Sequence, residues 1–178
     1  RFNANRQGGN TDTALKELQG WVDKKDDRGA RHVLASAYLS AQKNADAIRE
    51  SEKLLAKEAQ NPVLLNNLAW LYQQKSDKRA LEYGERAFKA APKSAAVIDT
   101  LAWILVEQGH DPKRGVELLK KAHEMAPKQG DIHYHLAVGL EKTGQTAEAK
   151  RSLERLIGAG TKFQSLDDAK ALLKKLGG

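Results

Sequence analysis

The chain has 178 residues, of which 40% are hydrophobic and 30% charged, so it can build a core and is not wholly disordered. It has no cysteine, which excludes disulfide frameworks, cysteine-based zinc sites and thiol catalysis. The net charge of +7 divides into +2 over residues 1–60, +2 over 61–127 and +3 over 128–178. Such an even excess is typical of a solvated surface rather than a nucleic-acid-binding stripe. No apolar run approaches the ~18 residues of a membrane span, so no transmembrane segment is expected.

The first predicted element is an amphipathic helix over about residues 11–25. Its apolar residues recur at the spacing of a helix: Ala14, Leu15, Leu18, Trp21 and Val22. We interpret it as the second helix of a pair whose first helix lies before residue 1 or at residues 1–6. The chain is therefore expected to be a fragment of a longer protein, whose remainder would carry any signal peptide or lipid anchor.

Four copies of one unit follow at a period close to 34 residues. A leucine followed by alanine recurs at spacings of 34, 33 and 35 residues: Leu34, Leu68, Leu101 and Leu136. A series of small residues keeps step at spacings of 33, 35 and 34: Ala47, Ala80, Gly115 and Ala149. Internal periods of this length indicate an array of stacked structural repeats.

Each unit is predicted to be a pair of antiparallel helices. Gly109 and Gly144 are expected to end first helices, and Pro92 and Pro127 to follow second helices. The small residues allow the two helix axes of a pair to approach closely. The predicted repeats cover residues 28–61, 62–94, 95–129 and 130–162, with residues 1–27 as the remnant of a preceding repeat.

This pattern resembles the tetratricopeptide repeat (TPR), a 34-residue helix–turn–helix unit. The resemblance covers residues 28–161. Two departures are Gly115, where the family usually has alanine, and Thr161, where it usually has proline. The resemblance implies an all-α protein, a right-handed α-solenoid that forms a single domain.

Residues 163–178 are predicted to form a capping helix, because a solenoid must cover its last hydrophobic face. Ser165, followed three residues later by Asp168, predicts an N-terminus close to a capping box. The apolar face of the helix consists of Leu166, Ala169, Leu172, Leu173 and Leu176.

No catalytic constellation occurs in the sequence, so we expect no enzymatic activity, no cofactor and no metal. His133 and His135 are two residues apart on a predicted helix and point to different sides, which disfavours a shared metal site. The glycine-containing stretch 158–162 lacks the spacing of a phosphate loop and is interpreted as a helix end and turn. The carboxylates Glu50 and Glu52 are interpreted as parts of a solvated helix face.

The first helices of TPR arrays line a concave groove. Alignment to the family places the following residues there: His32, Ser36, Leu39, Asn66, Trp70, Gln73, Asp99, Trp103, Val106, Tyr134, Val138 and Glu141. We single out six of them as candidate partner-binding residues: Asn66, Trp70, Gln73, Asp99, Trp103 and Tyr134. Trp70 and Trp103 lie one repeat apart and could form an aromatic strip for a ligand. The alternative is that each indole packs against the neighbouring helix pair and is largely buried.

Three runs, at residues 65–72, 99–109 and 134–137, are similar to the C-terminal repeats of long bacterial TPR lipoproteins associated with exopolysaccharide and PEP-CTERM/exosortase loci. This resemblance implies an interaction scaffold of the cell envelope, in the periplasm and lipid-anchored through a region outside this chain. Its partner would be a protein or peptide in the groove, or a polysaccharide. The alternative is a cytoplasmic adaptor or co-chaperone, although the groove positions lack the Lys and Arg of chaperone-tail-binding members. RNA binding is disfavoured by the even charge.

Overall fold

The structure, a computed structural model, describes residues 11–177, and within that range it contains ten α-helices and no strand. The helices are α2 (Thr11–Lys25), α3 (Arg28–Ser40), α4 (Asn44–Leu55), α5 (Pro62–Gln73), α6 (Arg79–Ala90), α7 (Ala95–Glu107), α8 (Pro112–Met125), α9 (Gly130–Lys142), α10 (Thr146–Gly158) and α11 (Leu166–Lys175). The predicted all-α class is confirmed. Each range predicted for a repeat between residues 28 and 162 holds one helix pair. Residues 1–6, one proposed place for a preceding helix, lie outside the described residues.

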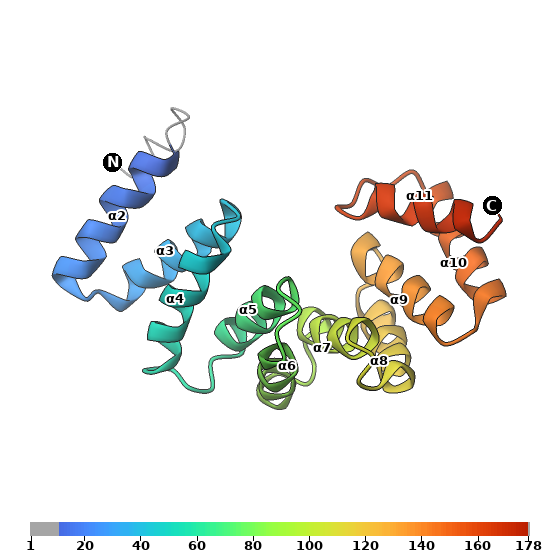
Figure 1. The fold of residues 1–178 in the computed structure, drawn as a ribbon, viewed down its shortest axis with the longest axis horizontal. Helices are drawn as coiled ribbons and strands as arrows, with labels where there is room; N and C mark the ends of the chain where they lie inside the picture. The colour runs from blue at the N-terminus through green and yellow to red at the C-terminus, as the bar shows by residue number, and fades with distance from the viewer. Residues whose placement is uncertain (1–10, 178) are drawn as a thin grey trace.

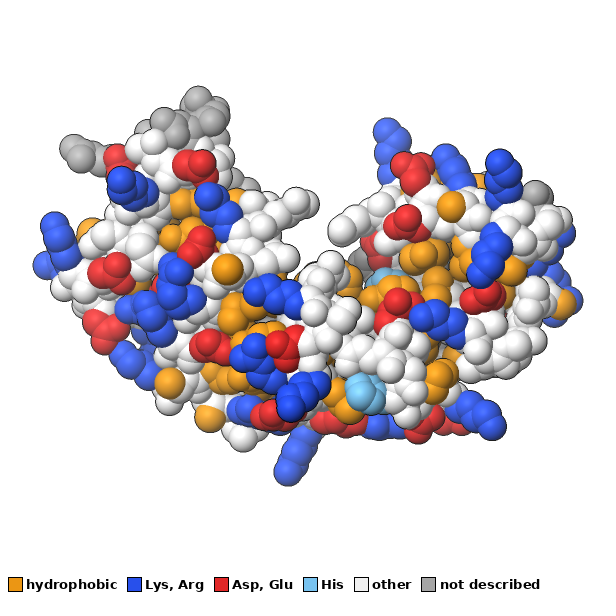
Figure 2. All heavy atoms as spheres, viewed as in Figure 1, with side chains coloured by type: hydrophobic (Ala, Val, Ile, Leu, Met, Phe, Trp, Pro, Cys, Tyr) orange, Lys and Arg blue, Asp and Glu red, His pale blue; other side chains and the backbone are white. Residues whose placement is uncertain are grey.

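The helices stack into an open arch. Each helix packs on the next along the chain, and α5, α7 and α9 also contact one another in succession, with α11 against α9. Figure 1 shows α2 and α11 at the two raised ends and α5 to α8 along the base. Figure 2 shows the hollow between the two arms and the mixed basic and acidic side chains over the outer surface. None of the described helices is long and apolar enough to cross a membrane.

Polar caps and glycines set the helix ends. The side chains of Asp27, Asn61 and Asp111 each accept a hydrogen bond from backbone N–H groups in the first turn of α3, α5 and α8, which would otherwise lack partners. Gly109 (φ 69°) and Gly144 (φ 81°) follow α7 and α9 in the left-handed region, which glycine adopts without steric cost. At each of these glycines the chain reverses direction, so that the following helix packs against the preceding one.

The helix pairs meet through small residues that have no exposed surface. Ala69, Ala80 and Ala149 are completely buried. The tightest approach is between α7 and α8, where a Cβ on Gly115 would lie 2.6 Å from Val106 Cγ2 and 3.0 Å from the carbonyl oxygen of Ala102. Alanine does not fit there without a shift, which explains why this chain has glycine where the family usually has alanine.

The interpretation of Glu50 as a solvated carboxylate is wrong. Its side chain is completely buried between α3 and α4, with Oε2 2.6 Å from Arg31 Nη1. Its other oxygen, Oε1, lies 3.0 Å from Arg49 Nε and 3.1 Å from Lys53 Nζ. Burial alone would raise the pKa of Glu50, but the hydrogen bonds from Lys53, Arg31 and Arg49 outweigh it and hold the pKa below its ordinary value. The carboxylate is thus the ionised centre of a buried ion-pair network.

The last helix, α11, covers the end of the solenoid. Ala169 is completely buried against Ala137 and Leu153, and Leu172, Leu173 and Leu176 pack around them. The capping box predicted at Ser165 is absent, because the Ser165 side chain makes no capping hydrogen bond. Its backbone N–H donates instead to Asp131 Oδ1, at 2.9 Å. The loop before α11 is therefore tied to the first turn of α9.

Candidate partner-binding groove

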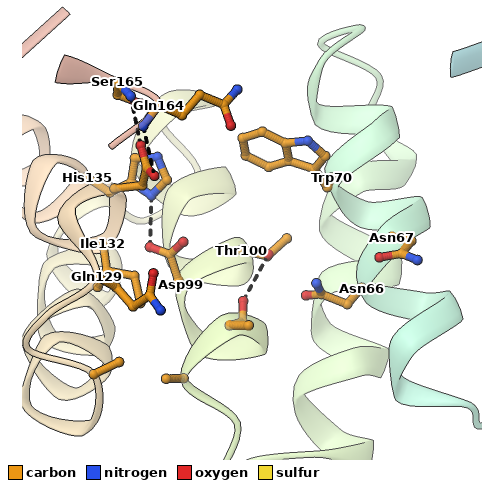
Figure 3. Close-up of a pocket in the computed structure, with 14 residues that line it drawn as sticks. Asn66, Asn67, Trp70, Asp99, Thr100, Gln129, Ile132, His135, Gln164 and Ser165 are labelled. Atoms are coloured by element: carbon orange, nitrogen blue, oxygen red, sulfur yellow. Dashed lines mark hydrogen bonds and ion pairs between the residues drawn. The ribbon is translucent and has the colours of Figure 1, made fainter. Parts of the chain in front are cut away.

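A pocket of about 550 Å³ opens between α5, α7, α9 and the loop that precedes α11 (Figure 3). Its size lies within the range of pockets that bind small ligands or parts of polypeptides, about 300–1,000 Å³. The residues that line it are Asn66, Asn67, Trp70, Ala95, Ala96, Asp99, Thr100, Ala126, Gln129, Asp131, Ile132, His135, Gln164 and Ser165.

Three of the six predicted partner-binding residues line this pocket, namely Asn66, Trp70 and Asp99. The indole of Trp70 forms one wall and faces the side chain of Gln164 across the opening (Figure 3). Trp70 is partly exposed, and its indole N–H makes no hydrogen bond to any residue between 11 and 177. It therefore has both an apolar face and a donor available to a ligand.

The other three predicted residues lie outside the pocket. Gln73 accepts a hydrogen bond from Gln108 Nε2 at 2.6 Å. Trp103 stacks on His135, with ring centroids 4.1 Å apart and planes 23° apart, and its ring centroid is 6.3 Å from that of Tyr134. Trp70 and Trp103 thus form no continuous strip: Trp70 lines the pocket, whereas Trp103 lies outside it and stacks on His135. Whether Gln73, Trp103 and Tyr134 contact a partner stays a prediction.

Two residues assigned to the groove by alignment are core residues. Val106 is 1% exposed and Val138 is 7% exposed. Val106 fills the space between α7, α8 and α9, where its Cγ2 would lie 2.6 Å from a Cβ on Gly115 and 3.4 Å from a Cβ on Gly139. The predicted groove orientation is wrong at these two positions because both side chains pack into a hydrophobic cluster that α7, α8, α9 and α10 share.

A hydrogen bond between Asp99 and His135 sets the polarity of the pocket floor. Asp99 Oδ1 lies 2.8 Å from His135 Nδ1, and both side chains are mostly buried, with 15% and 7% of their surface exposed. The carboxylate can only accept, so Nδ1 carries the hydrogen and donates it. The hydroxyl of Thr100 is likewise used, since it donates to the carbonyl oxygen of Ala96 at 3.0 Å.

The loop that precedes α11 forms a further wall of the pocket, which the sequence analysis did not predict. Asp131 accepts the backbone N–H groups of Gln164 and Ser165, at 3.4 and 2.9 Å. Phe163 packs so closely on Gly130 that a Cβ there would lie 2.5 Å from the Phe163 ring. These contacts bring Gln164 and Ser165 opposite Trp70, about one hundred residues away in the chain.

The pocket runs diagonally across the first helices. On α5 it uses residues on both sides of Leu68, whereas on α7 and α9 all its residues precede Leu101 and Leu136. This shift follows from the rotation that each repeat adds to a solenoid. Positions that are equivalent in the repeat therefore do not all line the same pocket. For this reason alignment to the repeat does not identify Asp131, Ile132 and His135 as pocket residues. The one local signal was the placement of Asp131 in the first turn of α9.

A second, smaller hollow of about 300 Å³ contains a histidine pair. The rings of His123 and His133 lie 4.4 Å apart, and His133 Nε2 is 2.8 Å from Ser152 Oγ. Burial lowers the pKa of His133 to about 4, and repulsion from His123 and Arg155 adds to the effect. Among residues 11–177 no group of three or more His, Cys, Asp or Glu could hold a metal ion.

The stability of the fold should fall as the pH drops from about 6.5 to 4 because of His133. Its pKa is near 6.5 when unfolded and about 4 when folded, so the unfolded chain binds the extra proton. The full stabilisation is present above pH 6.5, and we expect a loss of roughly 1–2 kcal/mol after solvent screening. Thermal melting at pH 7 and pH 5 would measure it, and His133→Gln should lose less stability over this interval. An identical pH dependence in the two proteins would contradict the assignment.

Comparisons with known proteins agree with this architecture. The sequence model of the tetratricopeptide repeat matches residues 110–176. MamA (residues 41 to the end) from Desulfovibrio magneticus RS-1 superposes with a TM-score of 0.74 at 19% identity, over 88% of this chain and 89% of that one. A tetratricopeptide repeat protein from Parabacteroides merdae gives 0.78 at 17% identity, over 98% and 70%.

Pseudomonas aeruginosa PilF is a further structural neighbour, with a TM-score of 0.70 at 20% identity, over 99% of this chain and 85% of that one. No curated protein matches the sequence. The likeness to the solved structures extends over nearly the whole chain, whereas the sequence match covers its C-terminal part. The chain therefore has the fold of a tetratricopeptide-repeat α-solenoid, and residues 110–176 carry the sequence pattern of that repeat.

Proposed function

We propose that this protein is a non-catalytic interaction scaffold that holds an extended segment of a partner protein in the pocket between α5, α7 and α9. The observation that carries the proposal is the pocket itself, with the unengaged indole of Trp70 on one wall. Extended peptides offer alternating side chains and backbone amides, and Asn66 and Asn67 offer amide groups beside Trp70 that can pair with such a backbone. A large rigid aromatic with free surface is the usual anchor of such an interface.

Trp70→Ala should weaken peptide binding at least about thirtyfold, because loss of an interface anchor typically costs 2 kcal/mol or more. A peptide enriched from a random phage-displayed library on the intact chain would serve as the probe, with its dissociation constant measured by fluorescence anisotropy. The helical circular dichroism of the variant should match that of the parent, because Trp70 belongs to none of the hydrophobic clusters.

Trp21→Ala is the matched control. Trp21 lies on α2, far along the chain from the pocket, and is 46% exposed. The affinity of this variant should stay within about twofold of the parent, as expected for a residue outside the interface. Failure to enrich any peptide, or equal losses in the two variants, would refute binding at the pocket.

The cellular context is a separate part of the proposal. The resemblance of residues 65–72, 99–109 and 134–137 to envelope TPR lipoproteins supports a scaffold in polysaccharide or surface-protein export, at the periplasmic face of a bacterial envelope. Antibodies to the chain should then detect the protein in the envelope fraction of its source cells. Detection in the cytosol alone would favour a cytoplasmic adaptor instead.

A further inference from the structure

The pocket differs in charge from the rest of the molecule. The chain carries a net charge of +7, yet two carboxylates, Asp99 and Asp131, line the pocket, and no lysine or arginine does. Other carboxylates of the same helices are already paired, since Glu107 is 2.8 Å from Lys142 and Glu141 is 2.9 Å from Lys175. The partial burial of Asp99 reduces solvent screening, so its attraction for a cation exceeds that of a surface carboxylate.

The charged hydrogen-bonding groups of the pocket, the carboxylates of Asp99 and Asp131, are acceptors. The donors of His135 and Thr100 are used by Asp99 and by the Ala96 carbonyl. The second oxygen of Asp99 has no hydrogen bond to any described residue, so it can accept one from a ligand. A ligand group that supplies several N–H donors therefore suits Asp99 better than one that supplies only oxygens.

The aromatic wall narrows the choice of cation. Trp70 faces the pocket from α5, while Asp99 lies on α7 (Figure 3). Guanidinium is planar, carries five N–H donors and is weakly hydrated, so it can stack on an indole and donate to a carboxylate at once. The lysine ammonium is a compact, strongly hydrated charge that gains less from the indole face.

We propose that the pocket binds an arginine side chain of the partner segment, with its guanidinium donating to Asp99 and stacking against Trp70. This assignment rests on the proposed function, because it names the residue that the same pocket selects. It also predicts discrimination against acidic tails, since a carboxylate or phosphate entering the pocket would meet Asp99 and Asp131.

The test uses a pair of probes that differ in charge and hardly in shape, Nα-acetyl-arginine amide and its neutral isostere Nα-acetyl-citrulline amide. Each is titrated at low salt into the isotopically labelled chain, and the indole N–H resonance of Trp70 is followed by NMR. The arginine probe should bind at least tenfold more tightly than the citrulline probe. Asp99→Asn should remove most of this preference, whereas Glu107→Gln, which changes a carboxylate outside the pocket, should preserve it.

Several results would overturn the assignment. Equal binding of the arginine and citrulline probes would show that charge is not recognised. Tighter binding of the lysine or glutamate analogue would show that the pocket selects another group. If the library peptide shifts the Trp70 resonance but the arginine probe does not, the arginine assignment fails while the peptide-binding function stands. If neither shifts it, the proposed function itself fails.

Discussion

Glu50→Leu should destabilise the protein by about 3–5 kcal/mol, because removal of one partner of a buried ion pair leaves the other charge buried. The Arg31 guanidinium would keep only Asp26, at 3.0 Å, after losing its completely buried partner. The network joins α3 to α4, so the loss should appear first in the N-terminal helices. Urea unfolding followed by circular dichroism would measure the free energy of unfolding.

The double variant Arg31→Met/Glu50→Leu separates an ion-pair effect from a packing effect. If uncompensated charge is the cause, the double variant should be much more stable than the sum of the two single losses implies, and closer to the parent. Asp26, Arg49 and Lys53 retain exposed surface, so water can solvate them once the pair is gone. Strictly additive losses would show that Glu50 stabilises the fold by shape rather than by charge.

Ala169→Asp should detach the C-terminal cap. The new carboxylate would be buried among Ala137 and Leu153 without a cation, and an unpaired buried charge costs several kcal/mol. Since a repeat is stabilised only by its neighbours, hydrogen exchange should accelerate in α11, α10 and the first turns of α9 while α3 and α4 keep their protection. The same variant should lose peptide affinity, because Gln164 and Ser165 would leave the pocket wall.

Ala171→Asp is the control on the same helix. Ala171 is exposed, so the substitution changes only helix propensity, at a cost of up to about 0.7 kcal/mol. Its exchange rates in α9 and α10 should match those of the parent. Similar acceleration by both substitutions would mean that α11 is weakened by helix propensity rather than by burial, and the capping role would be lost.

The helix pairs could be derived from the sequence because their signals are local. Apolar residues at helical spacing, the glycines that follow α7 and α9, and the prolines Pro92 and Pro127 act within a few residues of one another. A repeat also provides an internal check on the predicted helices, since each copy must pack against its neighbours in the same way. All helices from α2 to α11 accordingly lie within their predicted ranges.

For Glu50 the helical spacing of buried residues predicts its environment better than the general rule that charged residues face solvent. It lies three residues after Ala47 and four before Leu54, on the buried face of α4. Its charge suggested a solvent-exposed side chain, but its position on the helix places it in the interior. Arg31 on the facing helix is its ion-pair partner. The helical spacing predicted burial correctly because the position of a residue on the helix determines whether it is buried. The charge of the side chain determines only the free-energy cost of that burial.

The sequence by itself determined the all-α class and the apolar face of α11, and it singled out Trp70 and Asn66 as candidates for partner binding. Only the tertiary structure decided which residues share a pocket. Trp103 lies outside this pocket and stacks on His135, whereas His135 and Asp131 line it. The loop before α11 then added Gln164 from the far end of the chain. Such juxtapositions depend on the small angles between packed helices, which accumulate from repeat to repeat and leave no mark on any local pattern.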